Sequence, residues 1–276
     1  MNKKTLFAYI VLIGCIILLV GSYMQWKGNI KSVGGQSPIP ISSNPAGEND
    51  ESKGKDDKVD ESVNPEQDIE RLLALTANAD ELVKEVFKSR LESGEQIDFL
   101  ITGSTAMDDG NPGYAERLQA ALKESYGDSI NVAIAKIDGT SEEFIDEQME
   151  EEIDWSKGYD IVLFEPFTLN NNGIVTIEDE HAHINLFRKL LKEQVEDAVV
   201  VLQPPYPIYD ATYYPTQVEA LQAFANSEGI PYVNHWDAWP DADSVELLDY
   251  LEDKKVPNSD GAEVWANALI DYFIKE

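Results

Sequence analysis

Cysteine, histidine and basic residues are all scarce in this chain of 276 residues. Its one cysteine, Cys15, excludes an internal disulfide, so the fold does not depend on an oxidising compartment. There are 21 lysines and arginines against 52 aspartates and glutamates, which gives a formal net charge of −31. Charge of this sign repels phosphate groups, so neither nucleic acid nor an anionic lipid surface is an expected partner.

The first 26 residues have the pattern of a signal anchor. Lys3 and Lys4 precede residues 5–26, which carry no charge and are long enough to cross the hydrocarbon core of a bilayer. The basic residues predict a cytoplasmic N-terminus, with the rest of the chain on the extracytoplasmic face. The sequence LIGC, which ends at Cys15, also resembles a lipoprotein cleavage box. The apolar run continues past Cys15, which favours the spanning helix, and both alternatives tether the protein to a membrane.

Two further segments follow the predicted anchor. Residues 27–64 are rich in glycine, serine, proline and charge, which predicts a flexible linker. Asn64 can cap a helix and Pro65 suits its first position, so the folded domain is predicted to span residues 65–276.

From residue 97 onward, short apolar runs alternate with amphipathic ones. This alternation predicts the α/β class, as three layers with a five-stranded parallel sheet between two layers of helices and a core spanning 97–276. Ligands of such sheets bind beyond the carboxyl ends of the strands. The predicted strands are IDFLIT, INVAIAKI, DIVLFE, AVVVLQ and IPYVNH.

Polar residues follow the first three predicted strands. Ser104 and Thr105 come after the first, where a hydroxyl nucleophile or only a tight turn is expected. Gly139 follows the second strand, just before a capping box of Thr140 and Glu143. The helix that begins there has free N–H groups in its first turn, which are suited to stabilising an oxyanion. Asn170 follows the third, either as an oxyanion donor or as part of a solvated turn.

Aromatic residues dominate the two loops after the fourth and fifth predicted strands. Aromatic faces beside carboxylates suit sugar rings, which predicts a carbohydrate-binding surface; the alternative is that these side chains pack the loops against the sheet. The candidates are Tyr206, Tyr209, Trp236 and Trp239.

The order and spacing of these residues resemble the SGNH/GDSL hydrolase family over about residues 97–276. The resemblance implies a flavodoxin-like sheet and serine-type ester hydrolysis without a cofactor. Gly103 matches the glycine of the first block, which in strict register puts Ser104 at the aspartate and Thr105 at the nucleophile. A turn one residue shorter makes Ser104 the nucleophile. Gly139 matches the second block and Asn170 the third.

The last block of the family departs from its pattern at the catalytic histidine. Asp253 matches the aspartate of that block, and Pro257, Asn258 and Gly261 continue it. Val256 stands in place of the histidine and cannot accept a proton.

His235 is the histidine expected on the binding side of the sheet. We predict that it is a replacement base oriented by Asp237 or Asp241; the alternative is a structural role. His181 and His183 stand two residues apart in a predicted helix and point to different faces, so no metal site is predicted.

Two functions follow from these observations. The resemblance, the tether and the aromatic loops predict a membrane-tethered extracytoplasmic esterase or acyl-transfer enzyme for O-acyl groups of cell-envelope carbohydrate. Val256 favours a glycan-binding module of the same fold without catalysis. An ion- or nucleotide-binding flavodoxin-like domain is a third reading, disfavoured because no glycine-rich phosphate loop is present.

Overall fold

Four parallel strands form the centre of the computed structural model, which describes residues 65–275. They lie in the order β2-β1-β3-β4. Almost every β1 and β3 side chain is buried, as expected for inner strands covered on both faces. The strands are β1 (Ile97–Ser104), β2 (Ile130–Ile137), β3 (Ile161–Phe164) and β4 (Val199–Leu202).

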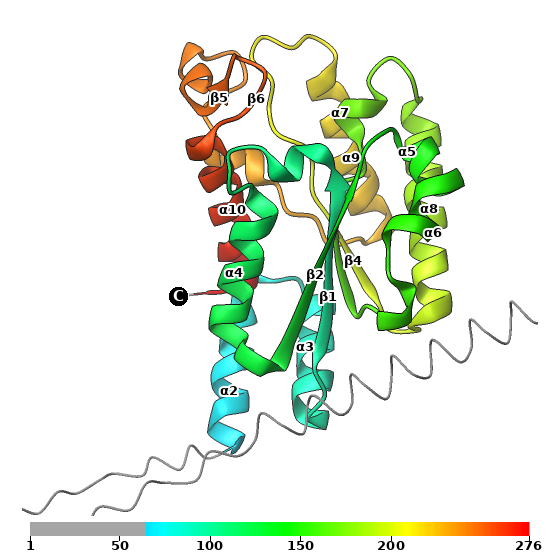
Figure 1. Ribbon diagram of the computed structural model, residues 1–276, viewed down its shortest axis with the longest axis vertical. Coiled ribbons are helices and arrows are strands. Elements are labelled where there is room, and N and C mark those ends of the chain that lie inside the picture. The colour runs from blue at the N-terminus through cyan, green and yellow to red at the C-terminus, as the bar shows by residue number, and fades with distance from the viewer. Residues whose placement is uncertain (1–64, 276) are drawn as a thin grey trace, which may run out of the picture. The chain divides into compact units, whose positions relative to one another are not determined.

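Helices cover both faces of the sheet, and each layer encloses its own cluster of buried apolar side chains (Figure 1). This confirms the three-layer α/β prediction. One layer contains α2 (Pro65–Leu75), α3 (Glu81–Ser93), α4 (Tyr114–Tyr126) and α10 (Ser259–Phe273). The other contains α5 (Ser141–Glu143), α6 (Met149–Glu152), α7 (Thr168–Asn171), α8 (Ile177–Gln194) and α9 (Tyr214–Glu228).

The predicted fifth strand is reduced to a single bridge between Leu202 and Tyr232, so the prediction of five strands is wrong. Leu202 N–H donates to the Pro231 carbonyl at 2.8 Å, and Val233 N–H donates to the Leu202 carbonyl at 2.9 Å. In this parallel register, the preceding hydrogen bond would run from the amide hydrogen of residue 231 to the Val200 carbonyl of β4. Proline has none, so the ladder ends there.

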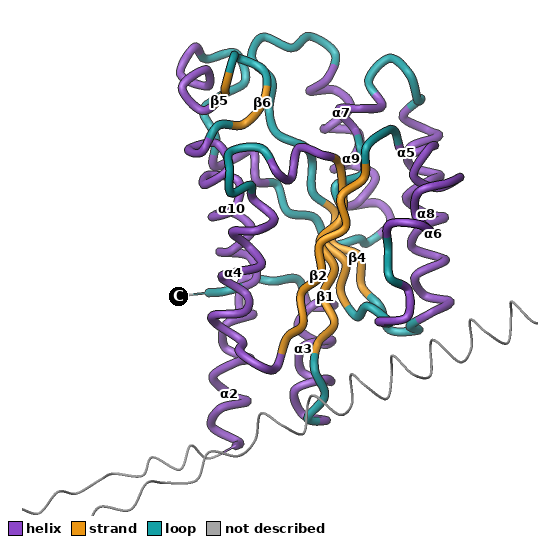
Figure 2. The backbone as a smooth tube through the Cα atoms, in the orientation of Figure 1, coloured by secondary structure: helices purple, strands orange, loops and turns teal. Residues whose placement is uncertain are grey.

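A short antiparallel hairpin of β5 (Leu251–Glu252) and β6 (Val256–Pro257) lies apart from the main sheet (Figure 2). Its turn holds Asp253 and Lys254 at positive φ, 50° and 61°. Two successive residues in this region are typical of a tight hairpin turn. The last-block aspartate of the family pattern therefore lies at the tip of a hairpin.

The predicted anchor, lipoprotein box and linker lie outside the described residues. Within residues 65–275, no helix has both the length and the apolar composition needed to cross a membrane.

We predict that a fragment of residues 65–276 folds alone, whereas one that begins at residue 95 does not. Val83 and Phe87 of α3 are fully buried, and Lys275 N–H donates to the Leu75 carbonyl at 2.7 Å. Burial of each large apolar side chain contributes about 1.5–3 kcal/mol, so loss of both helices removes much of a typical stability of about 5–15 kcal/mol. Urea unfolding followed by circular dichroism measures this. Equal midpoints for the two fragments would show that α2 and α3 are dispensable.

Candidate active site

The residues at the end of β1 differ sharply in exposure. Ser104 is the last residue of the strand, is 3% exposed, and donates its N–H to Glu165 Oε2 at 2.8 Å. Thr105 begins the 3-10 turn Thr105–Asp108 and is exposed. The structure therefore presents the Thr105 hydroxyl, and not that of Ser104, at the carboxyl edge of the sheet.

Glu165 is a buried carboxylate directly beneath this turn. Its Oε2 accepts from Ser104, and its Oε1 accepts the Phe167 N–H at 2.8 Å. Burial raises the pKa of Glu165, while hydrogen bonds from Ser104 and Phe167 oppose the shift. A Cβ on Gly103 would lie 2.7 Å from the Glu165 Cβ, so the glycine is needed for this close approach.

The second and third loops meet, as expected for the family arrangement. Asn170 Nδ2 donates to the Gly139 carbonyl at 2.7 Å, which joins the loop after β2 to α7, the short helix after β3. The predicted capping box of Thr140 and Glu143 is present. Gly139 has a φ of 144°, which L side chains rarely adopt. One N–H of the Asn170 amide is thus used within the protein, and the other is left as a donor.

Next to these loops lies a buried polar network that the sequence analysis missed. Glu180 accepts from Thr168 Oγ1 and from Asn171 Nδ2, both at 2.7 Å. Asn171 Oδ1 accepts the Ser141 N–H at 2.9 Å, and the Ser141 hydroxyl lies 2.9 Å from His183 Nδ1. Glu180 shares its helical face with the buried Ile184, Phe187 and Leu191. That spacing was the available signal, since a carboxylate on an apolar helical face must find partners.

His235 is fully buried, and both of its ring nitrogens are engaged. Its Nε2 lies 2.8 Å from the Pro204 carbonyl, and its Nδ1 accepts from Trp239 Nε1 at 3.1 Å. The ring stacks on Trp265 with the centroids 4.6 Å apart. Burial lowers the pKa of His235 to about 3. In this arrangement neither nitrogen is free to take a proton from a nucleophile, so the structural alternative describes His235 better than the replacement base.

The four candidate sugar-binding aromatics divide into two kinds. Tyr206 and Trp239 are buried. The Tyr206 ring packs beside Trp265 with the centroids 6.2 Å apart, and Trp239 Nε1 donates to His235 Nδ1 at 3.1 Å. Tyr209 and Trp236 are partly exposed, although Trp236 Nε1 donates to the Pro205 carbonyl at 2.6 Å. Packing is thus the role of Tyr206 and Trp239, and only the other two present faces to solvent.

The last block contacts the first block through residues other than Asp253. A Cβ on Gly110 would lie 2.6 Å from the Asn258 carbonyl, so the loop after β1 packs directly on the start of α10. Asn258 caps α10 by accepting from the N–H groups of Asp260 and Gly261. Asp253 is exposed and forms no hydrogen bond within residues 65–275, and Val256 is half-buried in β6.

Thr105 borders an acidic cavity of about 670 Å³. Lys136 of β2 lines it and forms an ion pair with Asp108. Asp138 and Glu151 are among the five carboxylates that line it, and no histidine does. Within the described residues, the side chains that can accept a proton in this cavity are therefore carboxylates. Within residues 65–275, no cluster of side chains suits a metal ion.

The chain was compared with known proteins. No family model and no curated protein matches it, but solved structures do. A protein assigned as a GDSL-like lipase from Parabacteroides merdae aligns with a TM-score of 0.53 at 14% identity, covering 64% of this chain and 95% of that one. The described domain has the SGNH/GDSL hydrolase fold.

Two further structures support the same fold. A lipolytic protein of the G-D-S-L family from Desulfitobacterium hafniense aligns with a TM-score of 0.50 at 16% identity, over 64% of this chain and 99% of its own. A catalytic mutant of an acetylxylan esterase from Geobacillus stearothermophilus aligns with a TM-score of 0.50 at 15% identity, over 65% of this chain and 95% of its own.

We predict that the His235 ring stays uncharged from pH 8 down to pH 5. Its pKa of about 3 lies below this range because burial penalises the charged ring. The nitrogen chemical shifts of His235, measured by NMR, should stay constant over this range. In urea-unfolded protein the same ring should titrate near its ordinary value of about 6.5. A native His235 that titrates between pH 5 and 8 would contradict the buried geometry.

We also predict that Glu180 makes the domain less stable as pH rises. Burial raises its folded pKa to about 7, above its usual 4.5, so the folded state holds the proton longer than the unfolded state does. The contribution is therefore fully present below about pH 4.5 and is lost as pH rises to about 7. The full loss amounts to about 3 kcal/mol. Urea unfolding at pH 5 and pH 8 should show a smaller difference for Glu180→Gln than for the wild type. An equal difference in both proteins would refute the assignment.

Proposed function

We propose that this protein is a membrane-tethered, extracytoplasmic ester hydrolase or acyl-transfer enzyme of the SGNH/GDSL type. It acts on O-acyl groups of cell-envelope carbohydrate, and Thr105 supplies the nucleophilic hydroxyl. The observation that carries this proposal is the exposure of Thr105 at the carboxyl edge of β1, where the fold places its nucleophile.

The surrounding loops supply the second requirement of ester hydrolysis, which is stabilisation of an oxyanion. Gly139, in the loop after β2, and Asn170, in α7 after β3, lie in hydrogen-bond contact. Donors held in place before the reaction account for a large part of the rate in acyl transfer. Such donors stabilise the transition state of acyl transfer, so they accelerate ester hydrolysis even where the general base is weak.

A carboxylate of the adjoining acidic cavity acts as the general base that accepts the proton of the Thr105 hydroxyl. Val256 occupies the place of the family histidine, and His235 is locked in the core. Asp and Glu serve as general bases, although a carboxylate of ordinary pKa is weaker than imidazole near neutral pH. We therefore expect slow turnover.

The proposed substrate class rests on three supports. One structural neighbour is an acetylxylan esterase, whose name describes removal of acetyl groups from a polysaccharide. Tyr209 and Trp236 offer partly exposed aromatic faces after β4. The apolar run at residues 5–26 has the length and the basic flank of a membrane anchor.

A second candidate is a glycan-binding module that has the same fold without catalysis. Two specific observations favour it: the burial of His235 and the presence of Val256 in the histidine position. In this case the carboxyl-edge loops hold the carbohydrate, and Thr105 is only a surface hydroxyl.

The decisive experiment is hydrolysis of p-nitrophenyl acetate by the full chain in detergent micelles. We expect Thr105→Ala to lose at least about tenfold in kcat/KM, because the hydroxyl nucleophile is gone, and Val256→His to gain about 10²-fold by adding general-base catalysis. Thr216→Ala is the matched control, since Thr216 is an exposed threonine on α9.

The pH dependence gives an independent check. The proposed wild-type mechanism uses no imidazole base, so the wild-type rate, corrected for hydroxide, should lack the rise at about pH 6.5 that an imidazole base produces. The Val256→His rate should rise through about pH 6.5. Absence of turnover in both proteins, together with binding of acetylated xylan by the wild type, would overturn the hydrolase in favour of the binding module.

A further inference from the structure

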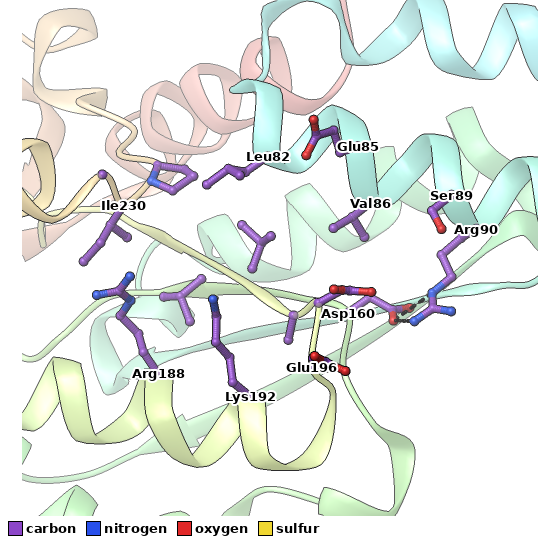
Figure 3. Close-up of a pocket in the computed structure, with 16 residues that line it drawn as sticks. Leu82, Glu85, Val86, Ser89, Arg90, Asp160, Arg188, Lys192, Glu196 and Ile230 are labelled. Carbon is purple, nitrogen blue, oxygen red and sulfur yellow. Dashed lines mark hydrogen bonds and ion pairs between the residues drawn. The ribbon is translucent and has the colours of Figure 1, made fainter.

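A second cavity, of about 390 Å³, is lined by Asp160 and Val199, among others (Figure 3). These residues lie at the starts of β3 and β4, whereas Thr105 follows the end of β1, so the cavity is at the opposite end of the parallel sheet. It opens along β4, which is an edge strand. Leu82 and Val86 of α3 line one side, and Arg188 and Lys192 of α8 line the other. These two helices belong to opposite layers, so the cavity lies where both layers extend past the edge of the sheet.

The cavity occupies the place of the missing half of the fifth strand. Val199 N–H donates to the carbonyl of Asp160, which directly precedes β3. In this parallel register the backbone groups of Val199 and Val201 bond to β3, and those of Val200 point away from β3 toward the open edge of β4. The fifth-strand segment bonds to Leu202 but contributes no bond to Val200, because Pro231 has no amide hydrogen. Val200 therefore keeps a backbone donor and a backbone acceptor without a strand partner, and it lines the cavity.

Two cations at the cavity lack an acidic partner at hydrogen-bond distance. Arg188 Nη1 donates to the neutral amide oxygen of Asn185 at 2.9 Å, and burial lowers the pKa of Arg188. Within residues 65–275, the side-chain ammonium group of Lys192 has neither a hydrogen bond nor an ion pair. Figure 3 shows both side chains rising from α8 toward the cavity. At the other end, Arg90 is already bound to Asp160 through two hydrogen bonds, at 2.9 and 2.6 Å.

We propose that this cavity binds the C-terminal end of an extended peptide, which adds a short strand beside β4. The peptide backbone pairs with Val200, and its terminal carboxylate contacts Arg188 and Lys192. Strand addition to a free edge, with a pocket for the terminal group, is an established mode of peptide recognition. Leu82 and Ile230 supply apolar contacts for the peptide side chains.

The lining charges restrict the ligand to a small number of negative charges. Asp160 is neutralised by Arg90, but Glu85, Glu196 and Asp197 also border the cavity and would repel a polyanion. A single carboxylate can contact Arg188 and Lys192 directly, which offsets that repulsion. An extended chain also satisfies both free backbone groups of Val200, which a compact anion does not. The volume, about 390 Å³, falls within the range of about 300–1,000 Å³ for ligand pockets and suits a few residues.

The test is fluorescence anisotropy with the full chain in detergent micelles and the probe fluorescein-Gly-Thr-Val-Thr-Val, which has a free carboxylate. We expect saturable binding with a Kd of about 10 μM to 1 mM. The C-terminal amide of the same peptide should bind at least tenfold more weakly, because the contact with Arg188 and Lys192 is lost.

Variants of α8 separate this site from general attraction to a basic surface. Arg188→Gln and Lys192→Gln should each raise the Kd several-fold, with unchanged thermal unfolding. Lys189→Gln is the matched control, because Lys189 lies on the same helix, does not line the cavity and pairs with Glu193. Equal Kd values for the acid and the amide, or equal effects of all three variants, would overturn the proposal.

Methylated peptides test the backbone pairing itself. In an added strand, alternate amides face β4. Two probes are therefore compared, one N-methylated at both valines and the other at both threonines. One of them should fail to bind, and the other should bind like the parent peptide. Equal binding of the two methylated probes, or no saturable binding of the parent peptide, would show that no strand is added at Val200.

Discussion

The carboxyl edge of the sheet depends on one buried carboxylate, that of Glu165. Its two oxygens hold the amide at the end of β1 and the amide of Phe167, so a single side chain sets the course of the chain after β1 and after β3. Phe167 has a φ of 64°, a region that is unfavourable for a bulky residue. The hydrogen bond to Glu165 helps to offset that cost. Because Ser104 is drawn inward to Glu165, the next residue, Thr105, is the one turned to the surface.

Behind this edge, polar side chains that resemble catalytic groups serve the packing of the fold. Gln203 is fully buried, with Nε2 bonded to the Tyr114 hydroxyl at 3.2 Å and Oε1 accepting from Trp265 Nε1 at 2.8 Å. His235 stacks on the same tryptophan. Buried groups satisfied in this way are costly to disturb. The imidazole is therefore held by the interior, and chemistry at the surface is left to the loops.

The two ends of the sheet differ in charge and in backbone pairing. At the carboxyl end, β1 and β2 pair up to Ser104 and Ile137, and the cavity beside Thr105 is lined mainly by carboxylates. At the other end, the edge of β4 is incomplete, and lysine and arginine from α8 border the opening. The chain has a net charge of −31, so two cationic side chains without an acidic hydrogen-bond partner, Arg188 and Lys192, are a distinctive feature of this cavity. They border the unpaired part of the β4 edge.

Much of the architecture could be predicted from the sequence, because local sequence patterns determine the strands and helices. Near-continuous apolar runs between amphipathic ones predicted a parallel sheet covered on both faces, and four of its five strands formed as expected. The capping box of Thr140 and Glu143 depends on neighbouring residues only, and it is present. The order of the family blocks likewise predicted that Gly139 and Asn170 lie together. Their strands, β2 and β3, flank β1, and all parallel strands of a sheet end at the same edge.

The rest was decided by contacts between residues distant in sequence. The choice between Ser104 and Thr105 depends on Glu165, which is 61 positions from Ser104. The role of His235 depends on Pro204 and Trp265, and nothing in the local sequence distinguishes an exposed imidazole from a buried one. Proline 231 was visible in the sequence, yet its effect follows only from the register against β4, which places it opposite the carbonyl of Val200. Burial and register are properties of the packed chain, and they set which of the candidate groups meets solvent.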